Sequence, residues 1–333
     1  MAGVKALRKI QLGKESAAGT AVAATALWRG EGVGTDTTLV EFPPEDVGIL
    51  GGTDRAYIPT VGGEVTMEGP ATYEQLPYIL EAGVELETGT VDSGASATPY
   101  IYEYNFPTTA QNTLRTYTIE AGDDQQAEEI AYCFVREFNL SGNAGEVVNV
   151  SATWQGRQWS TTTYTGAISV PTVEEILFQK AKLYIDDTDT YPATTQKSNT
   201  FLNFDLSVTT GIQAINTGDG ELYFSFTKQI MPEIVLQVTF EHDATAVAEK
   251  AKWRAGTARS VRIEVTGSAA AVAGDNYTYK TLFIDLVGKW ETFEAIGEQD
   301  GNDIVTGTLR CRYNGTAGAL GKFTVVNELS ALT

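Results

Sequence analysis

The chain has 333 residues, of which 42% are hydrophobic and 20% are charged, so a sizeable packed core is expected and global disorder is excluded. Its formal net charge is −20, and a surface this acidic repels phosphate, which disfavours DNA binding by counterion release. No apolar stretch is long enough for a membrane helix, and the N-terminus lacks the apolar core of a secretory signal. We therefore expect a soluble protein that is made in a cytoplasm.

Short strands separated by turns dominate the predicted elements, in keeping with the 33 Gly, 15 Tyr and 13 Phe. In the first half, strands are predicted at 38–42, 54–58, 64–68, 99–106, 113–121, 130–141 and 146–155, with a helix over 71–82 that Gly83 ends. In the second half, they are predicted at 180–186, 201–208, 221–227, 233–241, 260–267, 279–295 and 303–313, with a helix over 244–255. Residues 12–36 and 43–52 show no periodicity and are expected to be long loops.

Two stretches repeat one pattern of a strand followed by a helix. Residues 64–83 read EVTMEGPATYEQLPYILEAG, and residues 237–256 read QVTFEHDATAVAEKAKWRAG. Aligned without gaps, they share Val, Thr, Glu, Ala, Thr, Ala and Gly. Residues 136–157 and 289–312 follow in the same order, each as two strand-like runs around a Gly/Asn/Asp turn. The halves therefore look like one unit used twice.

The expected fold is mainly β, with two tandem antiparallel β-sandwiches that are each flanked by one helix. The first would span residues 1–157 and include an N-terminal arm, and the second would span residues 176–333. The Thr-rich segment 158–175, which contains one Pro, is the expected linker.

No constellation of residues supports catalysis, a cofactor or a metal site. His242 is the sole histidine and is expected at the surface beside a helix start, and no nucleophile-elbow motif accompanies it. Cys133 and Cys311 lie in strand-like apolar runs and are expected to be buried. GEGVG at 30–34 lacks the spacing and the lysine of a phosphate loop, so a flexible loop is expected there. We expect a protein that is not an enzyme.

Strand alternation predicts one polar face in each half. Val65 and Met67 alternate with polar residues in the first half, as Val238 and Phe240 do in the second. The residues predicted on the polar faces are Glu64, Thr66, Glu68, Asn149, Ser151, Thr153, Gln237, Thr239, Glu241, Thr306 and Thr308. An ordinary solvent-facing sheet would give the same pattern.

Three segments carry a family resemblance. KIQLGKESAAGTAVAATALWRG near the N-terminus resembles the opening of siphophage major tail (tail tube) proteins. VGGEVTMEGPATYEQLPYILEAG resembles their strand and helix, and SGNAGEVVNVSATWQGR resembles their closing strand pair. The resemblance covers most of residues 8–157, and the repeat extends it more weakly to 200–313.

The resemblance implies a structural role without catalysis. In that family, six copies of a β-sandwich with a helix form a ring around a lumen, and the rings stack into a tube. Two copies in one chain would then give a trimeric, pseudo-hexameric ring whose polar, acidic faces line a channel for double-stranded DNA without specific binding. The partners implied are further copies of the chain, a tape-measure protein and tail-end proteins, in the virion and in the host cytoplasm during assembly.

Contacts between subunits are expected at three places. The Pro-rich loop and the N-terminal arm 12–36 are candidates for ring stacking, and the second helix carries the strongest basic patch. The residues are Phe42, Pro43, Pro44, Glu45, Asp46, Val47 and Ile49 in the loop, and Lys250, Lys252, Arg254, Arg259 and Arg262 on and after the helix.

A carbohydrate- or receptor-binding β-sandwich, such as a virion adhesin or decoration protein, is the alternative function. It would need clustered exposed aromatic side chains in loops. Tyr100, Tyr102 and Tyr104 alternate within a predicted strand, which favours packing over a sugar platform.

Overall fold

The computed structural model describes residues 3–92 and 99–332. It is 49% strand and 8% helical, with large antiparallel sheets, which confirms the mainly β class. The strands up to residue 162 are β1 (Lys9–Lys14), β2 (Ala26–Leu27), β3 (Glu31–Asp36), β4 (Leu39–Glu41), β5 (Tyr57–Thr60), β6 (Gly63–Pro70), β7 (Thr90–Val91), β8 (Tyr100–Asn105), β9 (Tyr117–Gly122), β10 (Ala127–Asn143), β11 (Asn149–Gly156) and β12 (Trp159–Thr162).

The remaining strands are β13 (Ala181–Asp187), β14 (Gln196–Lys197), β15 (Phe201–Thr209), β16 (Ile212–Ile215), β17 (Phe226–Gln229), β18 (Glu233–Glu241), β19 (Ala258–Ala269), β20 (Tyr279–Phe293), β21 (Gly297–Gln299), β22 (Asn302–Cys311) and β23 (Gly321–Asn327). The α-helices are α1 (Leu76–Gly83) and α2 (Ala244–Arg254). Short 3-10 turns occupy Lys5–Leu7 and Phe178–Lys180.

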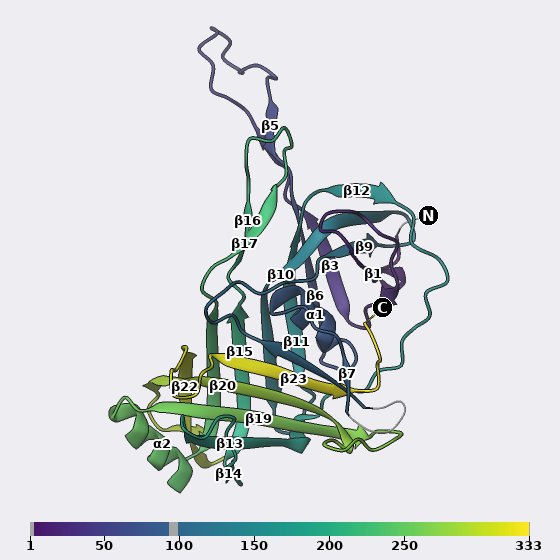
Figure 1. Cartoon of the computed structure of the whole chain (residues 1–333). Helices are drawn as coiled ribbons and strands as arrows, with labels where there is room; N and C mark the ends of the chain where they lie inside the picture. Colours follow the sequence, from purple (N-terminus) through teal and green to yellow (C-terminus); the bar gives the residue numbers. More distant parts are fainter. Residues whose placement is uncertain (1–2, 93–98, 333) are drawn as a thin grey trace.

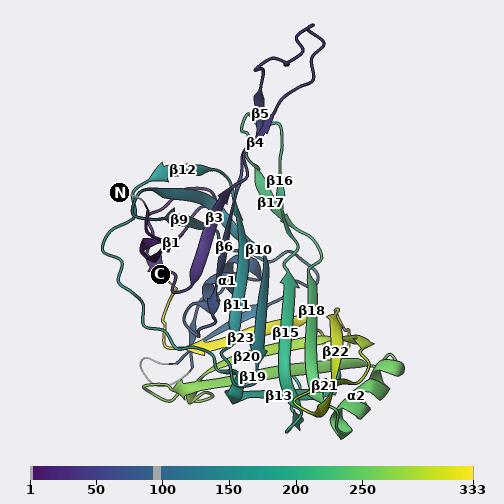
Figure 2. The same cartoon turned by 180° about the vertical axis from the view of Figure 1, so that it is seen from behind.

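One antiparallel sheet runs through both halves of the chain. Its strand order is β3-β6-β11-β10-β15-β18-β22, and Figure 2 shows these strands side by side. The junction between the halves is the pairing of β10 with β15, which runs from Glu137 opposite Thr209 to Asn143 opposite Asn203. We call this sheet the spanning sheet.

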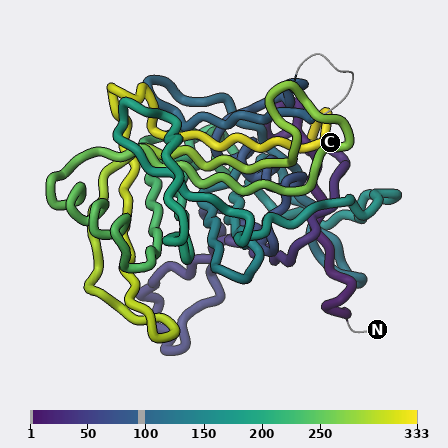
Figure 3. Tube along the Cα trace, turned by 90° about the horizontal axis from the view of Figure 1, so that it is seen from below, coloured from purple at the N-terminus to yellow at the C-terminus, as the bar shows by residue number. Residues whose placement is uncertain are grey.

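Further strands pack against the spanning sheet as a second layer. On the first half, the N-terminal part of β10 pairs with β9 and β12, and β9 pairs with β1. On the second half, β20 pairs with β19 and β23. These strands cross β15 and β18 at a steep angle in Figure 1, and Figure 3 shows β19, β20 and β23 running side by side across the molecule.

The boundary expected at 158–175 does not separate two sheets. One continuous cluster of buried residues includes Ile10, Trp154, Leu236 and Phe323 from both halves. β8 of the first half pairs with β23 of the second, and β12 lies inside the expected linker yet pairs with β10. The two halves therefore share a core, and β8 of the first half pairs with a strand of the second.

The prediction of a long loop at 12–36 is wrong, because β2, β3 and half of β1 lie within it. Four of the five residues of GEGVG, Glu31 to Gly34, belong to β3 and pair with β6, so the expectation of a flexible loop there is also wrong. Gly32 and Gly34 hide the alternation: a Cβ at Gly32 would collide with Ile10, and one at Gly34 would lie 2.7 Å from Trp159. Glycine allows these close contacts and removes the apolar signal.

The two helices end for different reasons, although both end near an identical Ala-Gly pair. Gly256 has a φ of 65° and donates to the carbonyl oxygen of Trp253 at 2.9 Å, as expected for a glycine that ends a helix. Gly83 instead is the last residue of α1 and is buried. A Cβ on it would lie 3.1 Å from Val135 Cβ and 3.2 Å from Thr210 Cγ2, so this glycine serves close packing against β10.

Candidate functional site

The broadest candidate surface is the polar face of the spanning sheet. Cross-strand partners in the register point to the same side, and one row across the sheet runs Glu68, Ser151, Asn139, Ser207. A second row includes Asn149 and ends in Gln237 opposite Thr308. The register therefore puts all the residues predicted for the two polar faces on one side of a single sheet.

The opposite face of this sheet is core. Met67, Trp154, Leu206, Val238 and Leu309 point into it, and each is at most 1% exposed. The hydrophobic effect thus fixes which way the sheet faces, because a slip by one residue would bury the polar row.

Sequence patterns alone missed the centre of the polar face. Asn139 and Ser141 on β10 and Asp205 and Ser207 on β15 join the two halves there, with Asn139 Nδ2 donating to Asp205 Oδ1 at 2.8 Å. Their alternation was visible in REFNLSGN and FLNFDLSV. The pairing of two strands some sixty residues apart was not.

One predicted residue of the polar face is not open to solvent. Thr239 is only 5% exposed, and its Oγ1 is hydrogen-bonded to Thr306 Oγ1 across the ladder, at 2.9 Å. Glu68, Asn149, Ser151 and Gln237 are exposed.

Two hairpins project together from the same end of the spanning sheet, as Figure 1 shows. The first, β4–β5, is inserted between β3 and β6, and the second, β16–β17, is inserted between β15 and β18. Val61 N donates to Leu222 O at 3.0 Å and ties the second hairpin to the base of the first. We call them the first and second hairpins.

The first hairpin exposes large apolar side chains, whose exposure to water is unfavourable in a monomer. Phe42 is 70% exposed and Leu50 is fully exposed. The other large apolar side chains exposed on the two hairpins are Leu39, Val40, Val47, Ile49, Tyr57, Ile58, Leu222, Phe226, Ile230 and Met231. A clustered apolar surface of this kind is typical of an interaction site.

The polar residues predicted for the stacking loop lie on the same projection. Pro43, Pro44 and Asp46 fall in the irregular segment after β4. Glu45 Oε1 lies 2.8 Å from Arg55 Nη1, and Thr53 donates to the other oxygen of this carboxylate. Hydrogen bonds from Thr53 and Arg55 lower the pKa of Glu45 below its ordinary value.

The basic patch predicted around the second helix is smaller than its sequence implies. Arg259 is buried, and its Nε and Nη2 donate to both oxygens of Glu249 at 2.9 and 2.7 Å. Arg262 makes a similar two-bond pair with the buried Asp285, at 2.6 and 2.9 Å. Burial raises the pKa of Asp285, and the guanidinium of Arg262 counteracts that shift.

The helix itself keeps three basic side chains. Lys252 Nζ lies 3.1 Å from Asp187 Oδ1, Arg254 is exposed and Lys250 is half-buried. The two arginines after the helix are therefore structural, and a contact with another subunit would rest on the helix lysines and Arg254 alone.

No chemical site emerges in the part of the chain that the structure describes. There, no group of three or more His, Cys, Asp or Glu residues is arranged to hold a metal ion. His242 is half-buried beside α2. Cys133 and Cys311 are buried as predicted, and burial raises the pKa of the Cys311 thiol to about 12.

The aromatic residues on β8 are packing residues. Tyr102 and Tyr104 are at most 1% exposed, and Tyr102 donates its hydroxyl to Leu329 O at 2.7 Å. The exposed aromatic cluster that a glycan-binding surface needs is therefore not on this strand.

A protein-family model described as phage tail tube protein matches residues 6–317. This match covers nearly the whole chain, including both halves. The chain belongs to the phage tail tube protein family. A comparison with curated proteins gives no match.

Membership of the tail tube family confirms the resemblance found in the sequence. It makes the chain a structural component of a phage virion that assembles with itself into a tube. None of the helices in residues 3–92 and 99–332 has the length and apolar character to span a bilayer.

Proposed function

We propose that this tail tube protein forms rings of three chains, in which each chain supplies two of six similar positions, and that stacked rings conduct DNA during ejection. The continuous spanning sheet carries this proposal, because a sheet that runs through both halves with one polar face has the form that a segment of a channel wall requires. Closure of the ring would pair the edge strands, which a free sheet leaves open to uncontrolled association.

The order of the elements supports an internal duplication. In the first half, β3, the first hairpin, β6 and a helix precede β10 and β11, and in the second half β15, the second hairpin, β18 and a helix precede β20 and β22. Both long strands carry a bulge opposite the following strand. When the two halves are aligned on these bulges, Met67 corresponds to Val238. The sequence alignment instead pairs Val65 with Val238, so the two alignments differ by two residues. A shift of two residues keeps every side chain on its face.

The polar face is proposed as the lumen wall. It carries Glu64, Glu68, Glu137, Asp205 and Glu233 among small uncharged side chains. Two arginines also reach this face, but Arg136 is paired with Glu64 and Arg310 with Glu233. Phosphate that meets such a wall finds more carboxylates than cations, so DNA slides instead of binding. A tape-measure protein would occupy this channel during assembly in the host cytoplasm, and tail-end proteins would close the tube.

Both hairpins are proposed as the contacts between stacked rings. They project from the same end of each chain, and their apolar side chains would be buried in the next ring. The sequence also suggested the N-terminal arm 12–36 as a stacking element. In this proposal the arm contributes β3 to the channel wall, and only its residues outside β3 are free to contact the next ring.

Negative-stain microscopy of the purified protein tests the proposal. We expect rings with threefold symmetry, or hollow tubes. A dispersed monomer at high concentration that binds glycans would contradict it and favour the alternative, a carbohydrate- or receptor-binding virion protein.

Reversing one charge on the polar face gives a second test, of the lumen assignment. We expect Asp205→Lys tubes to retain several-fold more double-stranded DNA than wild-type tubes at low salt, with retention falling as salt rises. Asp189→Lys is the matched control, because Asp189 is exposed but lies outside the spanning sheet. Equal retention by the two variants would show that Asp205 does not line the channel.

A further inference from the structure

The junction between the two halves shows how one tail tube unit grips the next. β15 pairs with β10 from Glu137 onwards, and the chain then turns into the second hairpin. At the turn, Thr210 N and Oγ1 donate to Arg136 O at 3.0 and 2.9 Å. The junction therefore has two parts, an edge pairing and a grip on the base of the hairpin.

Arg157 provides the grip. Its Nε and Nη2 donate to the carbonyl oxygens of Phe224 and Ser225, at 3.1 and 2.5 Å, and its guanidinium lies over the Tyr132 ring at 4.5 Å. Tyr132 and Phe224 belong to a small separate apolar cluster that also includes Ile212. Arg157 is the third residue after Trp154, which pairs with β10 at its bulge.

The second half has an arginine at the position equivalent to Arg157, but no hairpin in the described residues packs against it. β20 has the same bulge, after Trp290, and Leu309 of β22 lies opposite. The third residue after Leu309 is Arg312, which is exposed. In the part of the chain that is described, its guanidinium donates only to the neighbouring Cys311 O, while its main-chain N donates to Val287 O. Arg312 lines a groove of about 350 Å³ together with Val287, Trp290 and Tyr313 among others.

The edge of β20 beside this groove has no strand neighbour. β19 pairs with β20 only as far as Lys289, and in the described residues no strand lies beyond it on that side. Glu291 O, which occupies the position of Arg136 O, accepts a hydrogen bond from Trp253 Nε1 of α2 at 3.0 Å. In the single chain, α2 thus caps the site at which the internal junction places a threonine.

β3 in the first half is the equivalent of β15, the strand that pairs with β10 at the internal junction. Met67 and Val238 are equivalent when the two halves are aligned on their bulges. Gly32 lies opposite Met67 and Phe204 lies opposite Val238, so Gly32 and Phe204 are equivalent too. Residues 37 and 38 then correspond to 209 and 210, and both pairs are Thr-Thr. β15 is paired on both edges, whereas β3 pairs with β6 alone in the described part of the chain.

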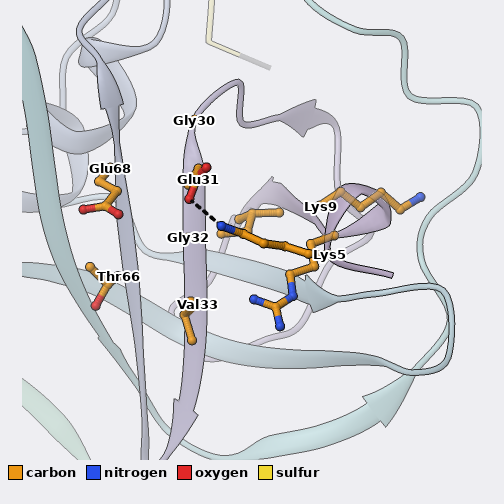
Figure 4. Close-up of a pocket in the computed structure, with 10 residues that line it drawn as sticks. Lys5, Lys9, Gly30, Glu31, Gly32, Val33, Thr66 and Glu68 are labelled. Carbon is orange, nitrogen blue, oxygen red and sulfur yellow. Dashed lines mark hydrogen bonds and ion pairs between the residues drawn. The ribbon is translucent and has the colours of Figure 1, made fainter. Parts of the chain in front are cut away.

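Charge complementarity supports the same match. The edge of β3 away from β6 lies beside a groove of about 210 Å³ that Lys5, Arg8 and Lys9 line together with Glu31 and Glu68. Figure 4 shows Lys5, which is paired with Glu31, and Lys9 on that side of β3. The segment that continues the free edge of β20 carries exposed Glu294 and Glu298. The basic side chains beside the β3 edge and the two glutamates beyond β20 suit a head-to-tail contact between copies. The groove beside β20 is itself lined by Lys289, Arg310 and Arg312, which suit main-chain carbonyl groups of a docked strand instead.

We propose that the β3 edge and first hairpin of one copy dock on the β20 edge and Arg312 groove of a second copy, in the register of the internal β10–β15 junction. This inference rests on the proposed tube function and specifies the contact that would close its ring. Thr292 would lie opposite Thr37 of the other copy, as Glu137 lies opposite Thr209. Arg312 would bind main-chain carbonyl groups of the docked hairpin, and Thr38 would displace the indole of Trp253.

A cysteine pair tests the register. Residues directly opposite on antiparallel strands lie about 4.5–5.5 Å apart at Cα, within the range of a disulfide. We expect the Thr37→Cys, Thr292→Cys variant to form interchain disulfides on mild oxidation, seen as dimers and trimers on non-reducing gels. Cys133 and Cys311 are buried and will not interfere.

Two further variants control for chemistry and position. Glu137→Cys with Thr209→Cys should form the same bond within one chain, and Thr37→Cys with Glu298→Cys should stay reduced because the two positions are out of register. Tubes without the Thr37–Thr292 cross-link would overturn this inference and leave the proposed function standing. Cross-linked oligomers that never form rings or tubes would support this inference and overturn the proposed function. Monomer alone would overturn both.

Arg312 has its own test. We expect Arg312→Ala to raise the concentration needed for assembly roughly tenfold or more, as for the loss of charge-assisted hydrogen bonds, without lowering the melting temperature of the monomer. Arg157→Ala should lower that melting temperature, because its partners lie within the same chain. Assembly of Arg312→Ala at the same concentration as wild type would show that Arg312 does not bind the docked hairpin.

Discussion

Deleting residues 43–51 is expected to leave a folded protein that no longer forms tubes. The deleted segment is the tip of the first hairpin, and it carries Val47, Ile49 and Leu50, which are 51%, 58% and fully exposed. Because this segment contributes nothing to the core, the melting temperature should stay within a few degrees of wild type. Its apolar surface, however, would be the part buried between rings. Sedimentation and microscopy would measure the loss.

Point substitutions sharpen the same prediction. Phe42→Ser, Ile49→Ser and Leu50→Ser together should block tube formation as the deletion does, because burial of these side chains would drive the contact. Asp46→Ser with Asp54→Ser is the matched control, since it removes exposed charged side chains of the same hairpin and keeps the apolar ones. Tubes that form normally after the deletion would show that ring stacking uses another surface.

Breaking the Glu249–Arg259 pair is expected to destabilise the fold more than any surface change near α2. The side chains of Glu249 and Arg259 are 4% and 6% exposed, and Trp290 Nε1 also donates to Glu249 at 3.0 Å. Glu249→Ala leaves a buried guanidinium without its main partner, which costs about 3–5 kcal/mol. Urea titration of the free energy of unfolding would measure it.

Two variants separate the buried charge from the packing. Replacing both residues, as Glu249→Met with Arg259→Met, should recover much of the stability, because no charge is then left unpaired. Lys252→Ala breaks an exposed pair with Asp187 on the same helix and should cost about 1 kcal/mol or less. A Glu249→Ala variant as stable as Lys252→Ala would mean that water reaches Arg259.

Local patterns in the sequence predicted elements well where the side chains alternate. The strand at 233–241 and the helix near 244–255 match β18 and α2 closely, because Leu236, Val238 and Phe240 alternate with polar residues and Asp243 caps the helix through Ala246 N. β3 was missed because its inward positions are glycines that the packing of other strands requires.

Charge patterns misled where ion pairs are buried. Lys252, Arg254, Arg259 and Arg262 form one basic run in the sequence. Only the fold brings Glu249 and Asp285 against the two later arginines, so their charge is neutralised inside the molecule. A sequence shows which charges are close along the chain, but not which opposite charges meet them in space.

The sequence by itself determined the β class, the presence of both helices and the position of the second, the polar and apolar faces of single strands and the family, whereas α1 begins at Leu76, five residues later than predicted. These properties are local, because alternation and capping act over a few residues. The tertiary structure decided that the polar faces join at β10 and β15, that β8 crosses to β23, and that β3 and β20 keep open edges. Strand pairing between distant segments depends on main-chain hydrogen bonds, which every residue except proline can donate, so the sequence carries almost no local mark of it.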